Sequence, residues 1–162
     1  MTHRVRETWM GTEVETLADL IPIEPRVVCV GINPAPASVA AGHYYQGRLG
    51  QRFFTRLRLA GLLPDLVEGW ADDAAFELGV GFTDVVKRPT ARATEVTLEE
   101  LNEGRGRLWT ILEEAGCPLV IFTFKKAAEA IVGRLEGNGF IPGLRPAGDS
   151  EVFVMPGPME KR

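Results

Sequence analysis

Two short runs of consecutive apolar residues constrain the fold of this chain more than any other feature of its sequence. Arg26–Ile32 (RVVCVGI) and Leu119–Phe124 (LVIFTF) are rich in β-branched and aromatic side chains and do not alternate with polar residues. This pattern is typical of strands that are buried on both faces, as in parallel sheets covered by helices. Because parallel strands need long crossover connections, which are usually helical, the two runs predict an α/β protein.

Helical periodicity accompanies these strands. Between Gln51 and Ala60, apolar side chains recur at helical spacing on one face, with arginines on the other. Thr97 and Glu100 have the spacing of a capping box, which predicts that the clearest helix of the chain opens at Thr97. The other elements that we expect are helices at 12–20 and 125–135, a short strand that runs into a loop within 78–86, and a last strand at 151–155. We therefore predict an α/β fold, a three-layer sandwich in which helices flank a central, mostly parallel, four-stranded sheet.

Composition places the chain among folded proteins of ordinary size. Its 162 residues, 45% of them apolar, suit a single domain over residues 1–162 and exclude an intrinsically disordered chain. No apolar run approaches the roughly 18 residues of a membrane-spanning helix, and the N-terminus lacks the apolar core of a secretory signal. Cys29 and Cys117 adjoin apolar runs, so we expect core thiols in a reducing cytoplasm. Two cysteines and two histidines cannot form a four-cysteine iron–sulfur cluster or a Cys/His zinc site from one chain.

The charge distribution favours a localised anionic ligand. The net charge is −4, but residues 25–64 contain no Asp or Glu and carry five arginines. An acidic protein with one basic stretch is compatible with a phosphodiester ligand and is unlike a wholly basic nucleic-acid binder. A solvated helix face is the alternative explanation of this stretch.

Ligands of parallel α/β sheets bind at the carboxyl ends of the strands, so the segments after the strands are the candidate site. These segments lack the glycine-rich fingerprint of dinucleotide-binding proteins, the phosphate loop of P-loop NTPases and the Gly-x-Ser-x-Gly of hydrolases. The first of them instead contains Gly31-Ile32-Asn33-Pro34, followed by Gly42-His43-Tyr44-Tyr45. An asparagine stiffened by prolines can hold a water or read a base edge, or it can simply end the strand in an Asx turn. Adjacent tyrosines can form a stacking wall.

Four segments of the chain, each of which begins within a predicted strand, contain distinctive motifs in a fixed order. VVCVGINPAPASVAAGHYYQGRLGQRFFTRLRLAGLL contains a strand that ends in G-I-N-P, a small-residue loop, an aromatic turn and a helix start. GFTDVVKRPTARATEVTLEEL fits the pattern G-[VL]-T-x-[LIV]-V-x-R-P-T. The other two segments fit their patterns less fully. One is VIFTFKKAAEAI, which matches a strand, a Lys and a helix, and the other is VFVMPGPMEKR, which matches a strand but has different residues where the pattern continues with N-P-S-G. Together the four segments resemble the mismatch-specific uracil/thymine-DNA glycosylases of the uracil-DNA glycosylase superfamily.

The resemblance implies an enzyme that extrudes a base from DNA and hydrolyses its N-glycosidic bond. It assigns the positioning of the attacking water to Asn33, and the lining of the base pocket to the backbone at Ile32 and Pro34. Tyr45 matches the aromatic residue on which the flipped base stacks. Tyr44 stays as an alternative, because the loop is one residue longer than the family pattern. No metal or organic cofactor is implied.

Two further residues near these motifs are candidates for the chemistry. Asp84 directly follows a predicted strand, where a carboxylate can face the site and activate water. The alternative is a loop acid that caps a backbone N–H. His43 is a candidate donor to the base or to a phosphate, and a buried or surface loop histidine is its alternative.

The resemblance also gives the basic stretch a function. Arg48 and Arg52, with Lys87 and Arg88, are candidate contacts to the phosphates on either side of the flipped nucleotide.

The C-terminal motif departs from the family. Gly157-Pro158-Met159-Glu160 stands where the family has Asn-Pro-Ser-Gly, in a loop that enters the minor groove. Gly157 removes a polar contact, Met159 can still act as an apolar wedge, and Lys161 can meet a phosphate. We therefore expect excision that depends less on an opposite guanine, unless this terminus is frayed.

These observations predict a monomeric, monofunctional DNA glycosylase that acts on uracil in DNA, mismatched duplex in particular. No lysine stands at a matched motif position where it would act as a Schiff-base nucleophile. Thymine or other damaged pyrimidines stay open as substrates. Two other classes also stay open, a non-catalytic DNA- or base-binding module of the same fold and an unrelated α/β enzyme acting on a small nucleotide or sugar.

Overall fold

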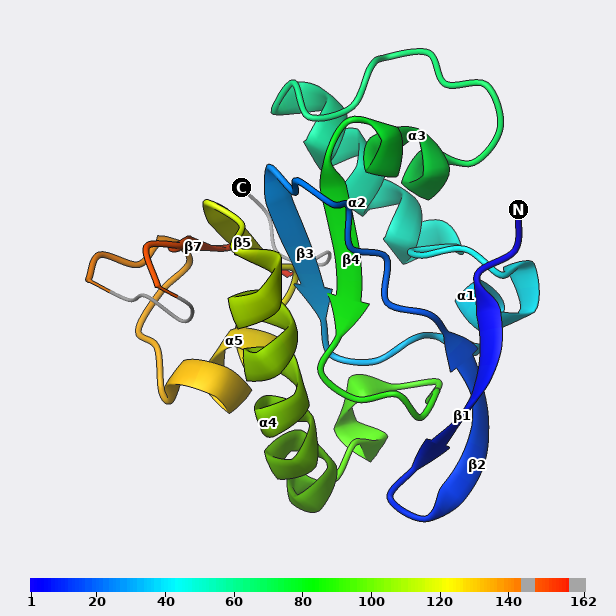
Figure 1. The fold of residues 1–162 in the computed structure, drawn as a ribbon, viewed down its shortest axis with the longest axis vertical. Helices are drawn as coiled ribbons and strands as arrows, with labels where there is room; N and C mark the ends of the chain where they lie inside the picture. The colour runs from blue at the N-terminus through cyan, green and yellow to red at the C-terminus, as the bar shows by residue number, and fades with distance from the viewer. Residues whose placement is uncertain (144–147, 158–162) are drawn as a thin grey trace.

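The central sheet is built around strand β3 (Val27–Gly31), all five residues of which are buried. The computed structural model describes residues 1–143 and 148–157 (Figure 1). The other strands of this sheet are β4 (Val80–Asp84), β5 (Leu119–Phe122), β6 (Gly139–Phe140) and β7 (Glu151–Val154). Their order is β4-β3-β5-β7-β6, parallel throughout except for the antiparallel β6–β7 pair. The mostly parallel sheet is confirmed, and it contains five strands instead of the predicted four, because a two-residue edge strand leaves no readable pattern.

Helices cover both faces of this sheet. Alternate residues of β3 enter two separate apolar clusters, Val28 and Val30 on the side of α4 and α5, and Val27 and Cys29 on the side of α2. The helices are α1 (Pro36–Ala41), α2 (Arg48–Leu59), α3 (Ala71–Glu77), α4 (Leu98–Ala115) and α5 (Lys125–Val132), with a 3₁₀ turn, η1, at Ala93–Glu95. The predicted three-layer sandwich is confirmed (Figure 1). None of the helices among the described residues is long and apolar enough to cross a membrane.

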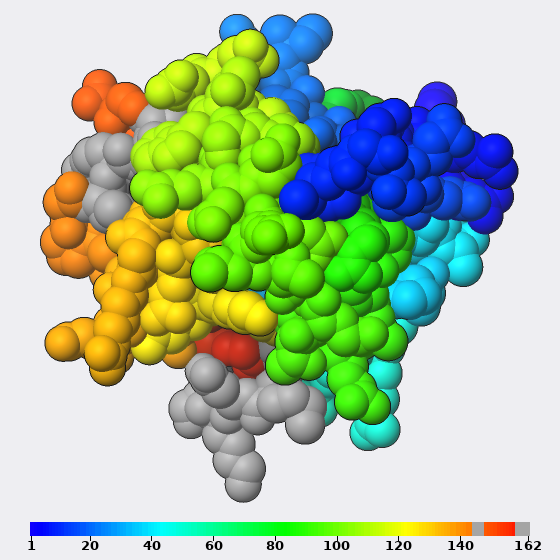
Figure 2. All heavy atoms as spheres, turned by 90° about the horizontal axis from the view of Figure 1, so that it is seen from below, coloured from blue at the N-terminus to red at the C-terminus, as the bar shows by residue number. Residues whose placement is uncertain are grey.

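The predicted helix at 12–20 is wrong. Strands β1 (Arg4–Trp9) and β2 (Thr12–Leu17) form an antiparallel hairpin there. Its two-residue turn places Met10 at φ 49° and Gly11 at φ 81°, the left-handed conformations that suit the twist of a tight hairpin. Figure 2 shows this hairpin in dark blue against the green segment that follows β4. The indole of Trp9 donates a hydrogen bond to Glu100 Oε1 (3.3 Å), so tertiary contacts support the strands where local propensity is weak.

Helix α4 begins as predicted. The Thr97 hydroxyl accepts a hydrogen bond from the Glu100 amide (3.2 Å), and the Glu100 carboxylate accepts one from the Thr97 amide (3.0 Å). Both halves of the capping box are therefore present. Further along the helix, Gly104 is buried and faces the carbonyl of Val85, the residue that follows β4. A Cβ at Gly104 would overlap that carbonyl, so the helix lies as close to the strand end as a backbone allows.

Two glycines of α4 make this contact testable. Gly104→Ala forces the helix away from Val85, and we expect it to lower the free energy of unfolding by about 2 kcal/mol or more, as overpacking does. Gly106→Ala is the matched control, because a Cβ there meets nothing within 4 Å and alanine favours the helix by roughly 0.5–1 kcal/mol. Urea denaturation of both variants measures the difference. Equal effects of the two substitutions would contradict the close approach.

Candidate active site

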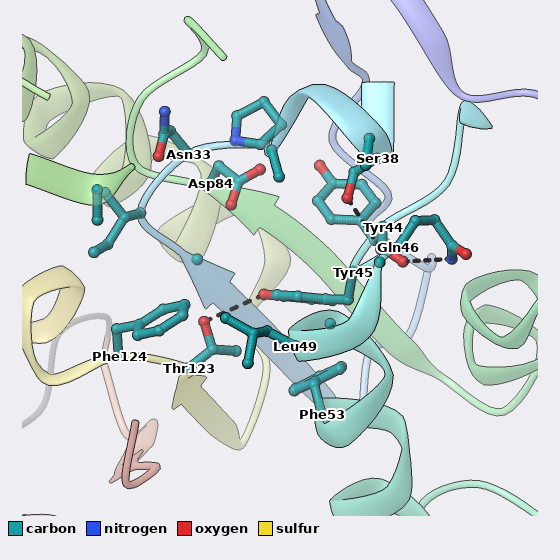
Figure 3. A pocket seen from close by; sticks show the side chains of 18 of the residues that line it. Asn33, Ser38, Tyr44, Tyr45, Gln46, Leu49, Phe53, Asp84, Thr123 and Phe124 are labelled. Atoms are coloured by element: carbon teal, nitrogen blue, oxygen red, sulfur yellow. Dashed lines mark hydrogen bonds between the residues drawn. The ribbon is translucent and has the colours of Figure 1, made fainter. Parts of the chain in front are cut away.

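A cavity of about 730 Å³ opens at the carboxyl ends of the parallel strands, where the sequence places it (Figure 3). Its wall is formed by the segments that follow β3, β4, β5 and β7, together with the start of α2. More than half of the site residues predicted from the sequence line it: Ile32, Asn33, Pro34, Tyr44, Tyr45, Arg48, Asp84 and Gly157.

Asn33 has a fixed orientation in this cavity. Its side-chain nitrogen donates hydrogen bonds to the carbonyl of Arg88 and to the hydroxyl of Thr90, both at 2.8 Å. The loop itself is held by the Thr90 amide, which donates to the Pro34 carbonyl (3.3 Å). Because both amide protons are used by the protein, the amide oxygen is the group of Asn33 that is left to accept a hydrogen bond from a ligand or water.

Asp84 ends β4 beside Asn33 (Figure 3). Asp84 is 4% exposed, and its carboxylate lies over Gly31, where any Cβ would overlap a carboxylate oxygen. Burial raises the pKa of Asp84 to about 7, with a smaller contribution from Asp19, while the charges of Lys87 and Arg107 lower it. A carboxyl that titrates near neutrality in a cavity can accept or hold a proton at physiological pH.

A polar network behind Asp84 includes one of the predicted DNA contacts. Arg107 donates to the backbone carbonyl of Asp84 and, at 2.6 Å, to Asp19. Lys87 is 2% exposed and donates to the carbonyl of Leu17 (2.5 Å) and to Asp19 (3.4 Å). The structure therefore gives no support to a phosphate contact at Lys87, whose ammonium group points into the protein.

The two tyrosines occupy different environments. Tyr45 takes a left-handed backbone conformation (φ 54°), and its ring lies 4.1 Å from that of Phe53, centroid to centroid. Its hydroxyl donates to Thr123 Oγ1 (3.4 Å), which lies at the end of β5. Tyr44 is 2% exposed, stacks on Phe82 and donates its hydroxyl proton to the carbonyl of Ala18 (2.9 Å). Tyr45 thus offers its ring to the cavity more than Tyr44 does.

His43 is not among the residues that line the cavity. It is 2% exposed, its Nδ1 lies 2.9 Å from Asp72 Oδ1, and its ring stacks on Trp70 at 4.0 Å. The prediction that His43 contacts the base is not supported, since the ring lies between α3 and the N-terminal segment.

The three arginines predicted to contact phosphates lie in different places. Arg48 and Arg52 are exposed in the first turns of α2, and Arg48 lies at the cavity wall. The guanidinium of Arg88 contacts both oxygens of Glu100, at 2.6 and 2.9 Å. These hydrogen bonds lower the pKa of Glu100 to about 2. Arg88 therefore stabilises the start of α4 through its ion pair with Glu100. The structure does not support its predicted contact with a phosphate.

The C-terminal loop is described only as far as Gly157, which lines the cavity. Arg56 of α2 donates to the carbonyls of Pro156 (2.6 Å) and Gly157 (3.3 Å), a contact that the sequence did not indicate. The predicted wedge Met159 and the phosphate contact Lys161 lie outside the described residues.

Several cavity residues were missed from the sequence. Thr90 belongs to the R-P-T segment and Thr123 follows β5 directly, so their place after strands was an available signal. The apolar wall had no such signal, because its members have the pattern of core residues: Leu49, Phe53, Phe124 and Met155.

A model of the Uracil DNA glycosylase superfamily matches residues 18–160. The chain belongs to this superfamily. The resemblance of the four segments is thus confirmed at the level of the superfamily, and the α/β fold agrees with it. The match supports DNA glycosylase activity on uracil, with DNA as the partner. Strands β1 and β2 of the N-terminal hairpin precede the matched residues.

The buried carboxyl of Asp84 makes stability depend on pH. Its pKa is raised from 3.8 to about 7 by folding, so the folded state favours the protonated form. The contribution of this group to stability is full below about pH 4 and is lost as the pH rises through 7. Asp84→Asn keeps the side chain neutral, so its stability relative to the parent protein should increase between pH 5 and pH 8 by on the order of 3 kcal/mol, because part of the full effect is already present at pH 5.

Urea denaturation at the two pH values tests this, with the exposed Asp65→Asn as the control. If the stability difference between the Asp84→Asn variant and its parent is the same at both pH values, folding does not raise the pKa of Asp84.

Proposed function

We propose that this protein hydrolyses the N-glycosidic bond of uracil in DNA, mismatched duplex in particular, and leaves an abasic site. The observation that carries this proposal is the oriented amide of Asn33 beside the buried carboxyl of Asp84, at the end of a cavity with an aromatic wall. One group can hold a water, the second can take its proton, and the wall can receive a planar base.

The base would stack on Tyr45. The backing of Phe53 and the hydrogen bond to Thr123 hold the tyrosine ring in place, so little side-chain freedom is lost when a base binds. Stacking of a base on an aromatic side chain is worth roughly 1–3 kcal/mol. Ala35 and Ala37 leave space elsewhere in the wall, which supports thymine as a further substrate.

Water activation would be shared between two residues. The Asn33 amide oxygen accepts a hydrogen bond from the water and orients it, and the ionised carboxylate of Asp84 takes the water's other proton. The water oxygen then bonds to the sugar carbon as the sugar–base bond breaks, and the base leaves with the electron pair of that bond. The transition state is oxocarbenium-like, so a positioned water suffices as nucleophile. No lysine lines the cavity in the part of the chain that the structure describes, which favours hydrolysis over a Schiff-base mechanism.

Asn33→Ala tests the water-positioning role. It should lower single-turnover release of uracil from U:G duplex about 10²- to 10⁴-fold, because one positioned group of the transition state is lost. Uracil release is measured as strand breaks after alkali, with circular dichroism as the check on folding. The control is Asn102→Ala, an exposed asparagine on α4. A loss below about threefold would move the role away from Asn33, whereas DNA binding by the parent protein without any release would indicate a non-catalytic module.

Asp84→Asn tests whether the Asp84 carboxylate acts as the general base. In the parent protein the rate should rise with pH and level off above about pH 7, as the Asp84 carboxylate ionises. The variant should be slower by about 10-fold or more at pH 8 and should lose this inflection. A variant that keeps the inflection would assign the titration to another group.

Arg48 and Arg52 are the proposed phosphate contacts. Arg48→Ala and Arg52→Ala should each weaken binding similarly for uracil-containing and undamaged duplex, and each should reduce the slope of log affinity against log salt by about one unit. Fluorescence anisotropy over a salt series measures both effects. The exposed Arg105→Ala on α4 is the matched control, and slopes equal to this control would make the stretch a solvated helix face.

A further inference from the structure

The only two histidines of the chain meet at one point of the fold. His3 comes from the segment before β1, His43 from the turn after α1, and Asp72 and Asp73 from the first turn of α3. One potential ligand atom from each of the four residues lies within 4.8 Å of the others. This cluster could not be predicted from the sequence, because its members are separated by up to 70 positions.

The cluster provides a mixed set of nitrogen and oxygen donors. His43 Nδ1 lies 2.9 Å from Asp72 Oδ1, and His3 Nε2 lies 2.5 Å from Asp73 Oδ1. The two imidazole rings are 5.1 Å apart and nearly perpendicular. Two neutral imidazoles and two carboxylates suit Zn²⁺, which binds such ligands at about 2.0–2.2 Å in a tetrahedron, and their charges would balance the ion.

Half of this donor set is already held in place. Asp72 is fully buried, and it accepts hydrogen bonds from the backbone amides of Tyr44 (2.8 Å) and Asp73 (3.0 Å). The ring of His43 is stacked on Trp70. Secondary contacts of this kind orient the ligands of metal sites. His3 and Asp73 are partly exposed, with side-chain exposures of 15% and 36%, so an ion has a path from solvent.

We propose that His3, His43, Asp72 and Asp73 form a structural site for a divalent transition-metal ion, with Zn²⁺ as the best fit. The bound ion would join the N-terminal hairpin, helix α3 and the turn that presents Tyr45. The contact between His3 and Asp73 opens to admit the ion, and the other two donors shift little. His3 precedes the residues that the superfamily model matches, so the match itself does not account for the complete site.

Calorimetric titration of the chelator-treated full chain with Zn²⁺ tests this proposal. We expect one ion per chain and a higher melting temperature with Zn²⁺, and no such rise with Mg²⁺. His3→Ala and Asp73→Asn should each weaken Zn²⁺ binding about 100-fold or more, since even the loss of a secondary contact costs about 10- to 100-fold. Both residues are partly exposed, so these variants should fold without the ion, which melting in chelator checks. The exposed Asp65→Asn is the control and should bind as the parent protein does.

The competing explanation is a pair of His–Asp ion pairs with no metal function. In that case Zn²⁺ leaves the melting temperature of the parent protein unchanged, and His3→Ala lowers it equally with and without Zn²⁺. Stoichiometric binding that persists in both His3→Ala and Asp73→Asn would also overturn the proposal, because the ion would then lie elsewhere. Uracil release is measured separately, so neither result decides the proposed function.

Discussion

One carboxylate, that of Asp19, joins the three segments on which the cavity depends. It accepts hydrogen bonds from Thr83 (2.6 Å) at the end of β4, from Arg107 (2.6 Å) on α4 and from Lys87 (3.4 Å) in the loop after β4. The next residue, Leu20, exchanges two backbone hydrogen bonds with Phe82 of β4. The N-terminal hairpin, the strand and the long helix are thus fastened together directly behind Asp84. A lone ammonium at 2% exposure would cost several kcal/mol, and the carboxylate of Asp19 offsets that penalty for Lys87.

This arrangement explains why Asp84 titrates near neutrality instead of lower. Two cations lie close enough to lower its pKa, but Asp19 takes hydrogen bonds from both of them, and the side chain of Asp84 itself stays in an apolar cavity. Desolvation therefore remains the largest influence on the carboxyl. The network stabilises the fold, but its cations do not fully offset the cost of burying a charge on Asp84. A pKa shifted by burial in this way is common among groups that transfer protons.

The sequence was sufficient for the central sheet and for the capped helix because those signals are local and strong. Continuous apolar runs marked β3 and β5, and the Thr97–Glu100 spacing marked the start of α4. The N-terminal hairpin was missed because its residues fit a helix as well as a strand, and only contacts such as that of Trp9 with Glu100 decide between them. Site residues show the same limit. Charge and position suggest a phosphate contact at Lys87 as well as at Arg48, but only three-dimensional packing shows that one points inward and the other to solvent.

The tripeptide His43-Tyr44-Tyr45 shows how a short motif can serve three purposes at once. The His43 ring enters the cluster with Asp72, the Tyr44 ring enters the core, and the Tyr45 ring lines the cavity. Consecutive side chains can diverge in this way because Tyr45 adopts a left-handed conformation, which is unfavourable for a bulky residue. The turn is held by the Asp72 carboxylate on the Tyr44 amide and by Gly50, where any Cβ would overlap the Tyr45 carbonyl. The stacking residue is thus presented by a strained turn, one anchor of which is the Asp72 carboxylate of the His–Asp cluster, so a change in that cluster can reach the cavity through this turn.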